Sequence, residues 1–214
     1  MHGPTASGRT ILYLIRHGAT ENNLSDPPRL QGSGVDLPLS VEGIEQAKGA
    51  AALLRNLPIR AVIASPLRRA QQTAECIASA CGLVLATEPD LREVDVGAWE
   101  QRSWVEIAQT EPEAYRNFQV DPGTHGYRGG ENFQQVRDRA LPALEKWLQA
   151  HRGSHVVVVG HNIVNRVLIA HAMGLSFSQA RPIHLDNGGI SVFLYEAAQL
   201  RLLTLNSAFH LPAS

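Results

Sequence analysis

The stretch Ile11-Leu12-Tyr13-Leu14-Ile15-Arg16-His17-Gly18 decides the fold class of this 214-residue chain. An apolar run of strand length ends abruptly in a cation, an imidazole and a glycine, and the glycine lets the backbone turn sharply and come close to a ligand. Ligands of open α/β sheets lie at the carboxyl ends of the strands. We therefore expect Arg16 and His17 to face an anion at such an end.

Short apolar runs alternate with helical patterns along the rest of the chain. Strands are expected at residues 11–15, 61–64, 83–86 and 156–159, and a weaker pair at 190–195 and 202–205 would form a hairpin at a sheet edge. Helices are expected after Ser40, from Ser65-Pro66 to about residue 80, over 132–150 and from Asn162 to near Gly174. Ser65 would cap the second helix, and Pro142 would kink or interrupt the third. The alternation predicts an α/β fold, a three-layer α/β/α sandwich with a mostly parallel central sheet.

The chain is expected to form one domain with a lid. Small polar residues predict a flexible tail over residues 1–9, followed by a single domain over 10–214. Residues from about 97 to 130 differ from the rest, because aromatic side chains alternate there with charges and glycines. We expect this segment to be a small, partly helical insertion over the strand ends.

Composition excludes several classes of partner. The formal net charge of −1 gives no basic field for nucleic acid or anionic lipid. No run approaches the ~20 apolar residues of a membrane span, and the first ten residues lack the apolar stretch of a secretory signal. Cys76 and Cys81, five residues apart in an expected helix, have a poor spacing for a disulfide or a zinc site, which suits a reducing cytoplasm. No cluster has metal-ligand spacing, so neither a metal nor another cofactor is expected.

Polar groups follow strands or start helices at five places. These are Arg16-His17-Gly18, Arg29-Leu30-Gln31-Gly32, residues 65–70, residues 91–97 and Gly160-His161-Asn162. The planar fork of arginine matches two phosphoryl oxygens, and a neutral imidazole can attack phosphorus. A carboxyl group can then protonate the leaving oxygen and later activate water, and Glu93 is the best-placed carboxylate by sequence. Together these segments predict a phosphate pocket.

This ordered set of motifs resembles the histidine phosphatase superfamily, the phosphoglycerate mutase-like proteins, over roughly residues 10–206. The resemblance implies that His17 is the nucleophile that forms a phosphohistidine and that Glu93 is the proton donor and acceptor. It also implies that the phosphate pocket is completed by Arg16, Arg69 and His161, with further contacts from Asn23 and Gln31. The sequence departs from the family at Ala19, where glutamate is common, at Asn162, where glycine is commoner, and in a loop after Gly32 that is one residue longer than usual.

Three functions stay open at this point. The first is a phosphatase of the superfamily that hydrolyses small phosphomonoesters, the second a phosphoglycerate mutase, and the third a phosphate-binding regulatory module without turnover. Only about 36 residues separate Glu93 from Gly130, and the segment after the last expected strand is short, whereas the mutases of the family carry longer ones. A shorter lid leaves water access to the phosphohistidine, which favours hydrolysis. The expected partner is a small phosphorylated metabolite, and the protein would be a monomer or homodimer.

Several side chains have two possible roles. Glu93 could form a plain salt bridge with Arg92 or Arg69, and Glu131 could cap a helix or orient an arginine. Asn187 lies in Asp186-Asn187-Gly188-Gly189, a pattern typical of a turn. The side chains that could receive a second anionic group of a substrate, or else lie solvated on the surface, are Arg92, Arg102, Arg116 and Arg128.

Overall fold

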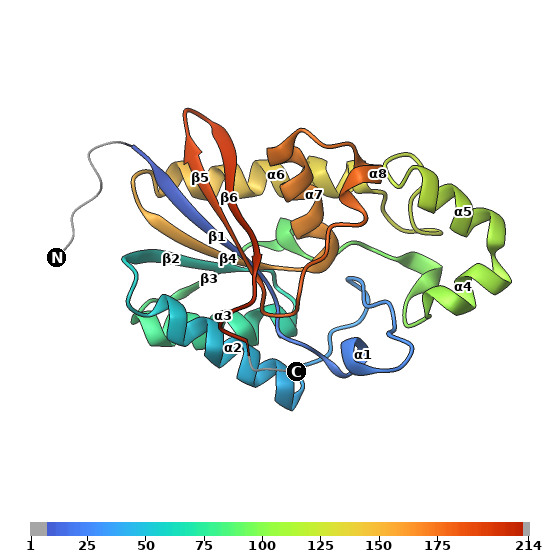
Figure 1. Ribbon diagram of the computed structural model, residues 1–214, viewed down its shortest axis with the longest axis horizontal. Helices are drawn as coiled ribbons and strands as arrows, with labels where there is room; N and C mark the ends of the chain where they lie inside the picture. Colours follow the sequence, from blue (N-terminus) through green and yellow to red (C-terminus); the bar gives the residue numbers. More distant parts are fainter. Residues whose placement is uncertain (1–7, 212–214) are drawn as a thin grey trace.

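The computed structural model describes residues 8–211, so residues 1–7 of the expected tail lie outside it (Figure 1). Its strands are β1 (Thr10–Arg16), β2 (Ile59–Ala64), β3 (Leu85–Thr87), β4 (His155–Gly160), β5 (Ile190–Glu196) and β6 (Gln199–Ser207). Its α-helices are α1 (Glu21–Leu24), α2 (Val41–Leu54), α3 (Arg68–Cys81), α4 (Trp104–Thr110), α5 (Pro112–Val120), α6 (Phe133–Ala150), α7 (Asn162–Met173) and α8 (Phe177–Ala180). Two short 3-10 helices, η1 (Pro89–Leu91) and η2 (Gly97–Trp99), complete the described elements.

One mixed sheet lies between two helical layers, as the sequence predicts. The strand order is β3-β2-β4-β1-β5-β6; β1, β2, β3 and β4 pair in parallel, and β5 and β6 form the antiparallel hairpin expected at an edge. Figure 1 shows α2 and α3 on one face of the sheet and α6 and α7 on the other. The chain therefore has the α/β/α architecture.

The central strand β4 explains why both faces are covered. Its valines are fully buried, and they alternate between two apolar clusters: Val156 and Val158 pack on the side of α6 and α7, whereas Val157 and Val159 pack on the side of α2 and α3. A continuous β-branched run fits a strand that is buried on both faces. Within residues 8–211, no helix combines the length and apolar content needed to cross a bilayer.

One local expectation is wrong, and another is wrong in part. The second helix does not begin at Ser65-Pro66, because α3 starts at Arg68 with Leu67 as its N-cap, and the buried Ser65 hydroxyl lies 2.6 Å from His161 Nε2 instead. Of the kink or interruption expected at Pro142, the interruption is absent, because α6 is one continuous helix. The proline lies on the exposed side of α6, while buried residues of the opposite face hold the helix on the sheet.

The segment from 97 to 130 contains η2, α4 and α5, and Figure 1 shows the two helices beyond one end of the sheet. Trp99 is fully buried at its centre, with the rings of Trp104, Phe118 and Tyr127 each 5.9 Å away, centroid to centroid. The Trp99 indole N–H donates to Glu111, which also pairs with two arginines, Arg102 and Arg128. These contacts make the segment a packed unit.

Candidate active site

The register of the two central strands brings the two motif histidines together. Strands β1 and β4 run parallel with Arg16 opposite Gly160, so the residue after each strand lies beside its counterpart. The ring centroids of His17 and His161 are 5.1 Å apart and their planes meet at 60°. A parallel pair in register therefore places two imidazoles, separated by most of the sequence, at one carboxyl edge of the sheet.

The loop after β1 depends on two glycines. A Cβ atom on Gly18 would lie 2.3 Å from the Gly43 carbonyl oxygen, and one on Gly43 would lie 2.0 Å from that of Ala19. Ser40 fixes the contact, because its hydroxyl accepts from the Gly43 amide at the start of α2 and donates to the Ala19 carbonyl. The backbone beside His17 is thus locked against the helix.

His17 has the protonation state that a nucleophile requires. Its Nδ1 lies 2.7 Å from the Gly18 carbonyl oxygen, and since a carbonyl only accepts, Nδ1 carries the proton and Nε2 keeps its lone pair. Burial, with the charges of Arg69 and Arg16 next, holds the pKa of His17 well below 6.5. The ring is therefore neutral at pH 7 while it lies beside cations.

His161 lies behind His17 and is fully buried. Burial lowers its pKa well below 6.5, with Arg69 and His17 adding to the effect. Its Nε2 pairs with the Ser65 hydroxyl, and its Nδ1 is buried with no partner in the described chain. The ring packs against His17 and does not line the cavity described next.

A cavity of about 180 Å³ opens beside His17. Of the predicted site residues, those on its wall are Arg16, His17, Asn23, Gln31 and Glu93. The carbonyl oxygens of both amide side chains accept from Thr20: Asn23 Oδ1 accepts from the Thr20 backbone amide at 3.0 Å, and Gln31 Oε1 accepts from the Thr20 hydroxyl at 2.7 Å. This leaves the amide N–H groups to donate to an added anion; the buried Gln31 Nε2 has no partner among residues 8–211. The longer loop after Gly32 does not remove Gln31 from the cavity.

The two predicted arginines, Arg16 and Arg69, donate to different parts of the backbone. Arg16 donates to the Leu185 carbonyl at 2.6 Å, and burial lowers its pKa to about 10 despite the opposing charge of Glu93. Arg69 is fully buried, and its Nη1 and Nη2 donate to the carbonyls of Val35 and Gly32 at 2.8 and 3.0 Å. Arg16 thus lines the cavity, whereas Arg69 holds the loop behind it with only Nε unpaired.

Glu93 sits at the amino end of α7. Its carboxylate accepts from the backbone amides of Val94 at 2.9 Å and of Ile163 and Val164 at 3.3 Å. The carboxylate forms no ion pair with Arg92 or Arg69 in the part of the chain that the structure describes. These amides orient the carboxyl group of Glu93, a residue that is only 4% exposed, on the wall of the cavity that His17 lines.

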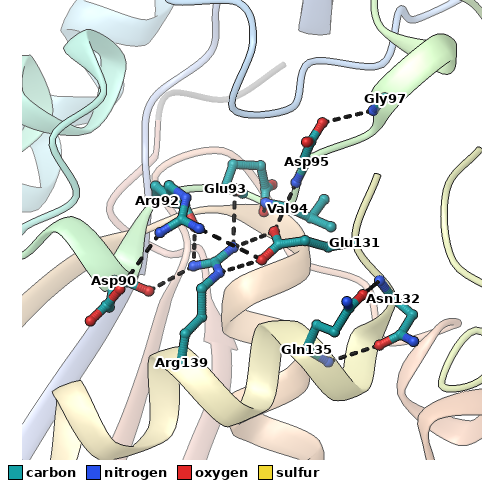
Figure 2. Close-up of polar contacts among 10 residues, drawn as sticks. All are labelled: Asp90, Arg92, Glu93, Val94, Asp95, Gly97, Glu131, Asn132, Gln135 and Arg139. Atoms are coloured by element: carbon teal, nitrogen blue, oxygen red, sulfur yellow. Dashed lines mark hydrogen bonds and ion pairs between the residues drawn. The ribbon is translucent and has the colours of Figure 1, made fainter. Parts of the chain in front are cut away.

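Arg139 holds the loop that carries Glu93, as Figure 2 shows. Its guanidinium forms two bonds with Glu131, at 2.7 and 2.8 Å, and donates to the carbonyls of Asp90, Arg92 and Glu93. Of the two readings of Glu131, the structure favours orientation of an arginine, because Asn132 caps α6.

Sequence reasoning missed two contributors. Asn187 is more than a turn residue, because its amide donates to the His17 carbonyl at 3.1 Å and to Asn23 Oδ1 at 3.3 Å. Arg166, on α7, lines the cavity. No motif pointed to Arg166, although its position one helical turn after Asn162 was a usable signal.

Comparisons with known proteins agree with this geometry. The family model of the histidine phosphatase superfamily (branch 1) matches residues 12–208. The probable phosphoglycerate mutase GpmB of Salmonella newport is 36% identical over 190 residues, which cover 88% of this chain and 86% of that protein.

Two solved structures have the same fold. A putative alpha-ribazole-5'-P phosphatase from Escherichia coli is 30% identical with a TM-score of 0.81, covering 92% of this chain and 96% of that one. Phosphoserine phosphatase from Entamoeba histolytica, in complex with 3-phosphoglyceric acid, is 25% identical with a TM-score of 0.85, covering 95% and 100%. The chain belongs to the histidine phosphatase superfamily.

Proposed function

We propose that this member of the histidine phosphatase superfamily hydrolyses small-molecule phosphomonoesters through a phosphohistidine on His17 Nε2. The observation that carries the proposal is the state of His17: a neutral ring, protonated on Nδ1 by its bond to Gly18, on the wall of a cavity shared with Arg16 and Glu93. A lone pair on Nε2 beside a cation suits in-line attack on an anionic phosphoryl group.

The reaction takes two steps. In the first, Nε2 of His17 forms a bond to phosphorus, the ester P–O bond breaks, and the Glu93 carboxyl gives its proton to the leaving oxygen. In the second, the Glu93 carboxylate takes a proton from a water molecule that attacks phosphorus, and the N–P bond breaks to release phosphate. Arg16 and the amide groups of Asn23 and Gln31 donate to the phosphoryl oxygens. Arg69 contributes through the loop that it holds, and His161 contributes through its packing against His17.

Hydrolysis and phosphoryl transfer differ in what accepts the phosphoryl group. The cavity of about 180 Å³ has room for a phosphoryl group with water, since one water occupies about 30 Å³. The lid between Glu93 and Gly130 holds two short α-helices, α4 and α5, and the 3-10 turn η2, and a small lid supports water access. The solved structures with this fold include a putative alpha-ribazole-5'-P phosphatase and a phosphoserine phosphatase. Phosphoglycerate mutase is the second candidate, because curated relatives are named probable phosphoglycerate mutase. The full set of candidate catalytic residues is present, which argues against a module without turnover.

The decisive experiment follows the phosphoryl group. A panel of phosphomonoesters is assayed for free phosphate beside a test of 3- to 2-phosphoglycerate isomerisation. We expect phosphate release to exceed isomerisation and His17→Ala to abolish it, whereas His171→Ala, at an exposed histidine at the far end of α7, serves as the matched control. Isomerisation faster than phosphate release would select the mutase. Activity that persisted in His17→Ala would remove His17 as the nucleophile.

The proposal also covers the cellular compartment, the substrate, the oligomeric state and the metal requirement of the enzyme. Cys76 and Cys81 are free thiols, which supports a reducing cytoplasm. The substrate is a small phosphorylated metabolite, and the enzyme is a monomer or homodimer that needs no metal.

A further inference from the structure

A second cavity, of about 300 Å³, adjoins the first on the side of the lid. The two cavities share four lining residues: Trp104, Tyr127, Ile163 and Arg166. The remaining wall of the second cavity is largely aromatic, with Tyr115 and Phe118 of α5 and Phe133 at the start of α6. A molecule whose phosphoryl group lies beside His17 can therefore extend into an apolar space under the lid.

Two arginines face this second cavity. Arg166 comes from α7, and Arg181 directly follows α8. Both are half-buried, and the Nε of each is buried without a partner in the described chain. Burial lowers the pKa of Arg166. Tyr127 and Glu93 oppose this effect, and the charge of Arg181 adds to it.

Two guanidinium groups at one cavity favour an anion between them. Glu93, on the wall of the first cavity, acts on Arg166, but the described residues that line the second cavity include no carboxylate. Three of the arginines that the sequence suggested for a second anionic group form ion pairs elsewhere. Arg102 and Arg128 bind Glu111, and Arg92 Nη1 lies 3.6 Å from Asp90 Oδ1. Arg116 lies exposed on α5.

We infer that Arg166 and Arg181 form a subsite for a second anionic group of the substrate. The substrate class is a phosphomonoester whose leaving alcohol has a flat, apolar body and carries a carboxylate or a second phosphoryl group at its far end. The aromatic wall takes the body, and the guanidinium forks take the second anion. The inference rests on the proposed function only in placing the reacting phosphoryl group at His17.

The test compares two substrates of nearly the same shape. 4-Carboxyphenyl phosphate and 4-carbamoylphenyl phosphate differ in one charge, so the ratio of their kcat/KM values reports recognition of the second anion. A charge-assisted hydrogen bond predicts a ratio of about tenfold or more in favour of the carboxylate for the wild type. Arg181→Met should bring this ratio close to one, Arg181→Lys should keep part of it, and Arg116→Met is the matched control on the lid.

The outcomes separate the two proposals. A wild-type ratio near one, with both compounds hydrolysed, would overturn the subsite and leave the phosphatase intact. A ratio that Arg181→Met and Arg116→Met lower equally would also overturn it, because a general loss of positive charge would then explain the effect. If neither compound is hydrolysed and no phosphohistidine forms, the proposed function fails. The subsite is then tested by calorimetry, in which 4-carboxybenzylphosphonate should bind about tenfold more tightly than its carboxamide; equal affinities would overturn it.

Discussion

Replacing Arg139 by methionine should weaken both the folded state and the reaction, because one side chain holds the loop that carries Glu93. The Arg139 side chain is 11% exposed and that of Glu131 17% exposed. The guanidinium forms the ion pair with Glu131 together with three bonds to loop carbonyls (Figure 2). Methionine keeps the length of the side chain and removes every one of these bonds. Glu131 is then left with the Asp95 amide at 2.9 Å and Arg92 at 3.8 Å.

The expected loss of stability follows from burial. Breaking a buried ion pair by removing one partner costs about 3–5 kcal/mol. Because both partners keep some exposure, we expect about 3 kcal/mol, at the lower end of that range. We also expect kcat to fall about tenfold to 100-fold, since a displacement of about 1 Å at a catalytic group costs about 100-fold.

Arg137→Met on the same helix is the matched control. Arg137 pairs with Asp138 at 3.1 Å, but the two side chains are 38% and 56% exposed, and the arginine lies over the Phe177 ring. Such contacts are worth about 1 kcal/mol or less. Urea unfolding followed by circular dichroism gives the free energies, and initial rates below the unfolding transition give kcat. Arg139→Lys should recover part of the stability but little of kcat, because an ammonium cannot make the forked contacts. The reasoning is refuted if both methionine variants lose equal stability, or if Arg139→Met keeps full kcat.

Four further outcomes are expected. Burial keeps the pKa of His17 and His161 well below 6.5, so both rings gain protons on unfolding. Below pH 6.5 these two rings should lower the free energy of unfolding by up to about 2.7 kcal/mol per pH unit, beside contributions from His155 and His210, and His161→Asn should remove about half of the two-ring contribution. Urea titrations between about pH 7.5 and 5.5 that show the same slope for both proteins would contradict this. Gly43→Ala should cost about 2–3 kcal/mol in the same measurement, because its Cβ meets backbone, whereas Gly34→Ala meets only a flexible side chain and should cost less; equal costs would argue against the close approach. Glu93→Gln should lower kcat about 100-fold or more in the phosphate assay, and a fall below about tenfold would exclude it as the proton donor. Activity should survive dialysis against a chelator, and its loss, restored by added metal, would show that a metal takes part.

The sequence predicted the sheet well and the local contacts poorly. Continuous valines in β4 can only fit a strand covered on both faces, and the structure has them there. The interruption expected at Pro142 is absent because the buried side of α6 holds the helix together across the proline. Ser65 does not cap a helix because its hydroxyl contacts His161 instead, and a rule based on neighbouring residues does not include that contact.

What the sequence alone determined is the order of the motifs and the position of each at the end of a strand or the start of a helix. His17 after β1 and His161 after β4 follow from local patterns, because hydrophobic runs and turn residues act over a few neighbours. Only the tertiary structure decided that Arg69 holds a loop behind the cavity, that Asn187 reaches the His17 carbonyl across 170 residues of sequence, and that Arg166 and Arg181 share one cavity. Such contacts depend on which strands pair and which helices cover them, and no pattern within one segment encodes the distance between two side chains from different elements.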